Sequence, residues 1–340
     1  MTKKLQLFLH IGHPKTASST MQAFLFKNWR ALEAVGLYMP SRNLEISSNI
    51  SPPENPLWAL QNIRQTQNTA PLVAWVKAAV SRIPTTGKLL LSSECLTQPE
   101  WPALLSTLPE IVDINLIYYI RRQDQLLLSA WRQWGLKRGL TLQDFLARRL
   151  KNKQPDFLNI IQGWTKEMPV NNIHVRFIHP PFLTGSTIIE DFCTHMGLKV
   201  GGFLAVKNQN ISIDARLALF LCNHPELFSS IHDEEIFNLL GSSSIHEPEV
   251  RLQFNEHQFQ AIYETFEPLN QQLLKAYHPN KAGTPVIDKA SAHIGDINLI
   301  ADKSAQIEYI RKRLETVAVP HEKLQKLQAI LHEEARHNHA

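Results

Sequence analysis

The stretch that most constrains the fold lies near the start of the chain and has the pattern of a strand, a short polar loop and a helix. Residues 5–11 are dense in strand formers, and Gly12 and Pro14 end this apolar run. An apolar stripe at helical spacing follows, made of Met21, Phe24, Leu25 and Trp29. Residues 5–27 therefore predict a strand that passes through a tight loop into a helix.

A loop of this kind is suited to binding phosphate. The helix directs its unpaired backbone N–H groups, and the positive end of its dipole, at whatever lies above the strand. Lys15 adds a mobile cation, and hydroxyl groups that can donate or cap the helix follow on Thr16, Ser18, Ser19 and Thr20. The alternative is an ordinary strand-to-helix turn with a lysine on the surface.

The loop does not match the pattern of nucleotide triphosphatases. That pattern, G-x-x-x-x-G-K-[ST], has its lysine at the helix start and a hydroxyl residue directly after it to hold magnesium. Here Gly12 is followed five positions later by Ala17, and Lys15 comes only three residues after Gly12. The phosphate compound is therefore expected to be of another kind.

A second strand is predicted at residues 88–93, and a carboxylate follows it. Gly87 precedes the apolar run, and Glu94 comes at its carboxyl end. Ligands of open α/β sheets lie outside the carboxyl ends of the strands, so Glu94 and the Lys15 loop are expected to open on one crevice. This placement makes Glu94 the candidate general base, with a helix cap before Pro99 as the alternative.

Two further strands are predicted downstream. Residues 114–120 form an apolar run that leads into Arg121 and then a helix, and residues 173–178 lead into a helix that ends at Gly197. A second strand-to-helix transition thus carries an arginine at the strand end.

The run Pro14-Lys15-Thr16-Ala17-Ser18-Ser19 resembles the 5′-phosphosulfate loop of sulfotransferases that use 3′-phosphoadenosine 5′-phosphosulfate (PAPS). The lead-in at residues 10–12 is similar to bacterial members of that family. Ala17 departs from the usual glycine, so a backbone angle that glycine accepts freely must here accommodate a Cβ. The resemblance implies an α/β, P-loop-like three-layer fold, with a central parallel sheet flanked by helices.

The resemblance also implies roles for particular residues. Lys15 and residues 16–20 would hold the 5′-phosphosulfate, and Glu94 would take the proton of the acceptor hydroxyl. Arg121 and Ser129, eight positions apart, match the family's 3′-phosphate motif, and the region of Lys207 resembles a loop that touches the nucleotide. The implied site residues are Lys15, Thr16, Ala17, Ser18, Ser19, Thr20, Glu94, Arg121, Ser129 and Lys207.

The function that follows from the resemblance is transfer of a sulfuryl group from PAPS to a hydroxyl acceptor, with PAP as by-product. By analogy with bacterial relatives the acceptor is expected to be a carbohydrate or other glycan, and no metal is required. Two alternatives stay open. One is a P-loop-like nucleotide-dependent kinase, which would need an acidic residue to hold magnesium, and the other is a non-catalytic PAP-binding protein.

The composition agrees with an enzyme that has an anionic ligand. The 340 residues are 44% hydrophobic and 19% charged, and a net charge of +4 is too small to argue for nucleic acid. Three cysteines without paired spacing indicate neither a disulfide framework nor a zinc site, so a cytoplasmic setting is expected. No apolar run reaches ~18 residues, so no membrane span is expected.

We expect a sulfotransferase domain at residues 1–282 and a helical extension at residues 283–340. Two narrow apolar stripes in the extension, at 307–317 and 324–331, predict amphipathic helices that either pack back on the domain or pair two copies in a homo-oligomer. Residues 41–56 predict a long loop with a lid or acceptor-binding role, or plain disorder, and residues 57–83 predict two helices.

Overall fold

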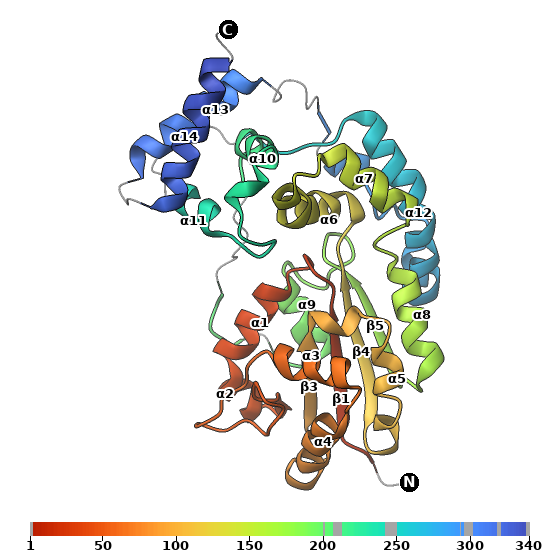
Figure 1. The fold of residues 1–340 in the computed structure, drawn as a ribbon. Coiled ribbons are helices and arrows are strands. Elements are labelled where there is room, and N and C mark those ends of the chain that lie inside the picture. Colours follow the sequence, from red (N-terminus) through yellow and green to blue (C-terminus); the bar gives the residue numbers. More distant parts are fainter. Residues whose placement is uncertain are drawn as a thin grey trace. The chain divides into compact units, whose positions relative to one another are not determined.

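The structure, a computed structural model, describes residues 3–199, 201–206, 213–241, 250–292, 294–295, 302–317 and 321–337. The chain divides into two compact units. The first comprises Met1–Arg122, Asp156–Gln209 and Leu269–Thr284, and the second comprises Gln123–Pro155, Asn210–Pro268 and Pro285–Ala340. Figure 1 shows the elements of both units in chain order. The expected domain boundary after residue 282 stays a prediction.

A five-stranded parallel sheet forms the centre of the first unit. Its spatial order is β2-β3-β1-β4-β5. The strands are β1 (Gln6–Gly12), β2 (Leu37–Tyr38), β3 (Lys88–Ser93), β4 (Asp113–Ile120) and β5 (Asn172–Phe177). The predicted α/β class with a central parallel sheet is confirmed, as are the four predicted strands. The sequence did not predict β2, because two residues are too few to show a period.

The register of the sheet brings the predicted site segments to one edge. Ile11 of β1 pairs with Ser93 of β3, and Gly12 pairs with Tyr119 of β4. The loop after Gly12, Glu94 after β3 and Arg121 after β4 therefore all leave the sheet at the carboxyl ends of three adjacent strands. This is the edge where open parallel sheets bind ligands.

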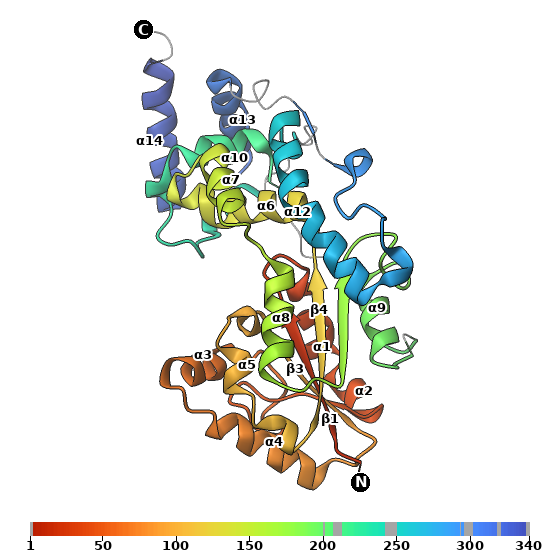
Figure 2. The same cartoon turned by 90° about the vertical axis from the view of Figure 1, so that its right-hand side faces the viewer.

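Helices cover both faces of the sheet, as Figure 2 shows. One face carries α1 (Ser18–Lys27), α2 (Trp29–Ala34) and α9 (Ile188–His195). The other carries α3 (Leu57–Thr66), α4 (Ala70–Arg82), α5 (Trp101–Leu104) and α8 (Phe157–Glu167). Two helices were predicted between residues 57 and 83, and both are present as α3 and α4.

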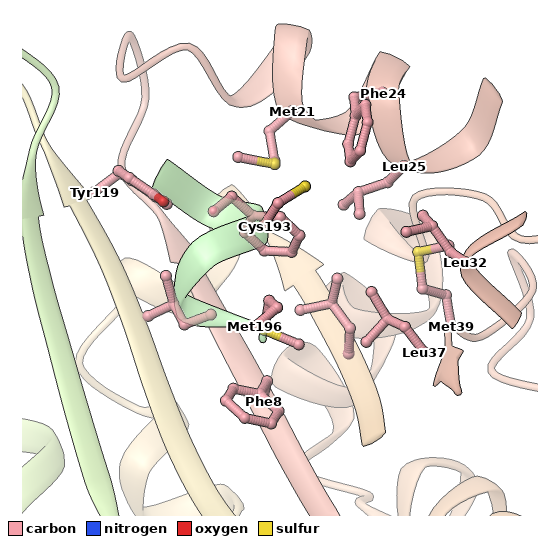
Figure 3. Close-up of a cluster of buried hydrophobic side chains, with 13 residues drawn as sticks. Phe8, Met21, Phe24, Leu25, Leu32, Leu37, Met39, Tyr119, Cys193 and Met196 are labelled. Atoms are coloured by element: carbon pink, nitrogen blue, oxygen red, sulfur yellow. The ribbon is translucent and has the colours of Figure 1, made fainter. Parts of the chain in front are cut away.

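The core on the first face is a continuous cluster of buried side chains (Figure 3). The strands contribute Phe8 and Tyr119, α1 contributes Met21 and Phe24, and Met196 directly follows α9, each no more than 5% exposed. Burial of side chains of this size is the main term that holds a helix on a sheet. The apolar stripe that predicted α1 therefore faces the sheet as expected.

The apolar stripe that predicted one helix is divided between two helices, α1 and α2. α1 ends at Lys27, and Trp29 begins α2 after the buried Asn28. The Asn28 amide donates to the carbonyls of Phe24 (3.0 Å) and Leu204 (3.1 Å), and the Leu204 N–H donates to Asn28 Oδ1 (2.6 Å). An asparagine that hydrogen-bonds to helix carbonyls competes with the helix, and here it also anchors the segment around residue 204.

A buried polar network joins the sheet to α9. The Tyr119 hydroxyl donates to Asp191 (2.8 Å), and Arg176 of β5 forms an ion pair with the same carboxylate (2.5 Å). Burial alone would raise the pKa of Asp191, but Arg176 and the Thr184 N–H keep this pKa below its ordinary value. Asp191 thus has a structural role in the first unit.

Residues 41–56 form a loop that is folded on itself. Isolated backbone bridges join Pro40 to Ile46 and Ser41 to Pro53, and Leu44 is buried. The expectation of plain disorder is wrong for this loop, because its backbone is paired within it. Its role as a lid or an acceptor-binding segment stays a prediction.

The second unit is helical. Its helices include α6 (Gln123–Ala130), which continues as the π-helix η3 (Trp131–Gly135), and then α7 (Leu142–Lys151), α10 (Ala215–Cys222) and α11 (Glu235–Gly241). α12 (Glu256–Tyr277) contains Pro268, where the chain passes from the second unit to the first.

Both predicted C-terminal helices are present, as α13 (Lys303–Thr316) and α14 (Glu322–His337). α13 packs against α10 and α14, and Arg313 of α13 donates to the carbonyl of Leu240 (3.0 Å). The packing of these helices on their own unit follows one of the two expected arrangements. Pairing between two copies of the chain stays a prediction.

Within the described ranges, no helix has the length and apolar character needed to span a membrane. The same ranges contain no group of three or more His, Cys, Asp or Glu residues arranged to hold a metal ion.

Candidate functional site

The loop that joins β1 to α1 is a tight turn with two residues in the left-handed region. Lys15 has φ 69°, and Ala17 has φ 58° and ψ 24°. Thr16 between them is buried, and both its N–H (3.2 Å) and its hydroxyl (2.6 Å) donate to the His13 carbonyl. The donors of Thr16 therefore stabilise the loop itself, and its contribution to phosphate binding stays a prediction.

The start of α1 retains donors that the helix cannot use. Ala17 is the N-cap residue, and none of the side chains that the structure describes caps this end. The first helical hydrogen bond runs from the Met21 N–H to the Ala17 carbonyl (3.0 Å), so the N–H groups of Ser18 and Ser19 precede the helical ladder. The expectation that the hydroxyl residues cap α1 is wrong, and the uncapped end is suited to an anion.

The structure brings Arg121 to the same loop. Its guanidinium Nη1 donates to the Lys15 carbonyl at 3.4 Å, which is a long hydrogen bond. Lys15 and Arg121 are both half-buried. The Arg121 side chain thus reaches the loop that contains Lys15, within the first unit.

The structure does not test the roles predicted for Ser129 and Lys207. Ser129 lies on α6 in the second unit, whereas Arg121 belongs to the first. The predicted 3′-phosphate pair of Arg121 and Ser129 therefore stays a prediction. Lys207 lies outside the described residues.

Glu94 lies beside the loop that joins β1 to α1. It is the first residue of the 3₁₀ helix η1 (Glu94–Thr97), and its Oε1 accepts a hydrogen bond from the hydroxyl of Ser18, the first residue of α1. The alternative, a helix cap before Pro99, is wrong, because the N-cap of α5 is Glu100. The carboxylate is half-buried and faces the helix start.

Three side chains converge on Gly12 at the end of β1. A Cβ at this position would lie 3.6 Å from Glu94 Cγ, 3.6 Å from Ser18 Cβ and 3.7 Å from His10 Cε1. These are ordinary van der Waals distances, so the three side chains pack around the glycine. His10, Ser18 and Glu94 therefore lie together beside Gly12.

His10 is a residue that the sequence did not single out for a role. Its Nδ1 shares a hydrogen bond with the Ser92 hydroxyl (2.7 Å), and its ring meets the edge of Tyr119 at 5.7 Å between centroids. Burial lowers the pKa of His10 from 6.5 to about 4, so the imidazole is neutral at pH 7. A histidine paired with a serine across two strands could have been found only once the register of β1 and β3 was known.

The arrangement combines two chemical capacities. The uncapped helix start, Lys15 and Arg121 supply donors and positive charge for an anion, and Glu94 supplies a carboxylate that can accept a proton. Both lie at the carboxyl ends of β1, β3 and β4.

No protein-family model matches the chain, and no curated protein matches it in sequence. The solved structures that are similar to it at low levels include the following two. One is a sulfotransferase from Alicyclobacillus acidocaldarius, with a TM-score of 0.34 and 11% identity over 68% of this chain and 95% of that one. The other is a retinol dehydratase in a complex with retinol and PAP, with a TM-score of 0.26 and 12% identity over 94% of this chain and 84% of that one.

Replacing Ala17 by glycine should stabilise the protein. A Cβ at φ 58° is strained, and glycine removes the strain, so the free energy of unfolding should rise by about 0.5–1 kcal/mol. Ala23 within α1 is the matched control, because Ala23→Gly should lower the free energy of unfolding by about 1 kcal/mol. Urea unfolding of both variants measures this, and a loss of stability in Ala17→Gly would show that the loop is not strained at that residue.

Stability should fall in mild acid because of His10. The pKa of His10 in the folded protein, about 4, lies below its ordinary value of 6.5. The contribution of the neutral imidazole to the free energy of unfolding is therefore fully present above pH 6.5 and is lost as the pH falls from 6.5 to 4. The loss at pH 4 should reach about 3 kcal/mol. His10→Gln removes this contribution, so the difference in unfolding free energy between wild type and variant should change with pH. Parallel pH curves for the two proteins would contradict the assignment.

Proposed function

We propose that the chain is a sulfotransferase that uses PAPS and sulfates a hydroxyl acceptor. The single observation that carries the proposal is that the Ser18 hydroxyl, at the start of α1, donates to Glu94. A proton-accepting carboxylate thus lies beside the loop whose residues 14–19 resemble a phosphosulfate loop. Arg121 at the Lys15 carbonyl adds positive charge to the same place.

The residues present fit the 5′-phosphosulfate end of PAPS. The N–H groups of Ser18 and Ser19 would donate to the phosphate, and the Lys15 ammonium would neutralise the charge that develops on the oxygen between phosphorus and sulfur. Arg121 would support this end of the nucleotide or, with Ser129, the 3′-phosphate. PAPS supplies the sulfuryl group when it is bound.

Glu94 would act as the general base in this reaction. The acceptor oxygen forms a new bond to sulfur while the bond from sulfur to the bridging phosphate oxygen breaks. The acceptor proton passes to the Glu94 carboxylate, and the electron pair of the broken bond stays on PAP. The products are a sulfate ester and PAP, so atoms and charges balance. A glycan acceptor and a cytoplasmic setting belong to the proposal.

A nucleotide-dependent kinase is the second candidate, and the same observation favours it. A kinase needs an acidic residue close to the phosphates to hold magnesium, and the Glu94 carboxylate at the helix start could serve. The two functions differ in donor and in metal requirement. Turnover of PAPS that survives a chelator would favour the sulfotransferase, and turnover of ATP that a chelator abolishes would favour the kinase.

The main test is transfer of labelled sulfate from PAPS to a panel of oligosaccharide, lipid and small hydroxyl acceptors. Glu94→Gln should lower turnover by about 100-fold without weakening PAP binding, because the proton acceptor is lost while the groups expected to hold the phosphate are kept. Lys15→Ala should weaken PAP binding by about tenfold, since one charge-assisted hydrogen bond is removed.

Exposed residues of the same type provide the controls. Glu110 precedes β4 at the opposite end of the sheet, and Lys77 lies on α4, so Glu110→Gln and Lys77→Ala should behave as wild type. Full turnover in Glu94→Gln would remove Glu94 from the role of base. Absence of both PAP binding and transfer in the wild type would overturn the proposed function.

A further inference from the structure

The hydrogen bond between Ser18 and Glu94 joins the helix start that could bind an anion to the carboxylate that could accept a proton. Ser18 begins α1 and is 4% exposed, and its hydroxyl donates to Glu94 Oε1 from an element 76 residues away in sequence. Because the serine is buried, its hydroxyl has little access to water in place of Glu94. Its neighbour Ser19 is exposed and makes no such contact with the carboxylate among the hydrogen bonds of the described residues.

The geometry around Gly12 fixes this pair. Glu94 Cγ and Ser18 Cβ each lie 3.6 Å from the place that a Cβ of Gly12 would take. The Thr97 hydroxyl donates to the Glu94 carbonyl (2.9 Å) and closes the turn of η1. Packing around Gly12 and the closed turn of η1 therefore keep the carboxylate close to Ser18. Ser18 is itself fixed because it is the first residue of α1.

A serine hydroxyl has a single proton to donate. In the structure this proton is directed at Glu94. An anion at the start of α1 would be a second acceptor for it, because the residue also belongs to the first turn of the helix. The carboxylate and the anion cannot both receive that proton, so they compete for it.

We propose that the Ser18 hydroxyl is a positioning group that links occupancy of the phosphate loop to the state of Glu94. In the free protein the hydroxyl proton is held by Glu94. When the 5′-phosphate of the nucleotide binds, the hydroxyl turns to a phosphate oxygen, and Glu94 Oε1 is released to accept the proton of the acceptor. This inference rests on the proposed function, and it predicts that Glu94 loses a hydrogen-bond donor, and so becomes a better proton acceptor, only after the nucleotide is bound.

Coupling through Ser18 should change the affinity for the nucleotide, which can be measured without turnover. Glu94 opposes nucleotide binding in two ways, by its charge and by holding the Ser18 proton. Removal of Glu94 should therefore tighten PAP binding, and part of this effect should require the Ser18 hydroxyl. A cycle of single and double variants separates the two parts.

Calorimetric titration of PAP into wild type, Glu94→Ala, Ser18→Ala and the double variant provides the test. Glu94→Ala should tighten binding by about tenfold when Ser18 is present and by about twofold when residue 18 is alanine, since one charge-assisted hydrogen bond depends on the hydroxyl. The matched control is Ser19→Ala, which should leave the effect of Glu94→Ala unchanged. An equal effect of Glu94→Ala with and without the Ser18 hydroxyl would overturn the proposal.

A second cycle, in the absence of any ligand, distinguishes failure of this inference from failure of the proposed function. The unfolding free energies of the same four proteins should be non-additive, because each single variant breaks the same hydrogen bond. If wild type fails to bind PAP, the proposed function is wrong, and the titrations are repeated with inorganic pyrophosphate. Additive unfolding free energies, or no anion binding at all, would overturn the coupling through Ser18.

Discussion

The turn that carries β1 into α1 is the constraint on which the rest of the site depends. Two residues with side chains adopt the left-handed region there, and Thr16 holds the turn by two hydrogen bonds to one carbonyl. Such angles cost free energy at any residue other than glycine, and they persist only where the surroundings impose them. The result is a helix that begins directly above a central strand with its first N–H groups outside the helical ladder.

Two hydrogen bonds connect this turn to the neighbouring strand ends. The Ser18 hydroxyl reaches Glu94 after β3, and the Arg121 guanidinium after β4 reaches the Lys15 carbonyl. A parallel sheet places the carboxyl ends of its strands at one edge, so residues more than 70 positions apart in sequence become neighbours. The opposite charges of Glu94 and Arg121 lie on either side of the loop in strand order.

Much of the first unit could be predicted from the sequence because buried strands and amphipathic helices repeat at their own periods. The four longer strands and α1 follow from such runs, whereas β2 has only two residues and shows no period. The end of α1 at Lys27 could not be predicted, because hydrogen bonds to Leu204, far along the chain, hold the Asn28 side chain in place. The same holds for the site. Local pattern indicated Lys15, Glu94 and Arg121, but the pairing of His10 with Ser92 requires the register of two strands.

The central claim is that the turn after β1 is the place where the nucleotide's 5′-phosphate binds. The most direct test is an experimental structure of the chain with PAP. The account predicts the 5′-phosphate at the start of α1, within hydrogen-bonding distance of the N–H groups of Ser18 and Ser19 and of the Lys15 ammonium. A structure in which PAP binds elsewhere on the chain, with this helix start in contact only with solvent, would contradict the account.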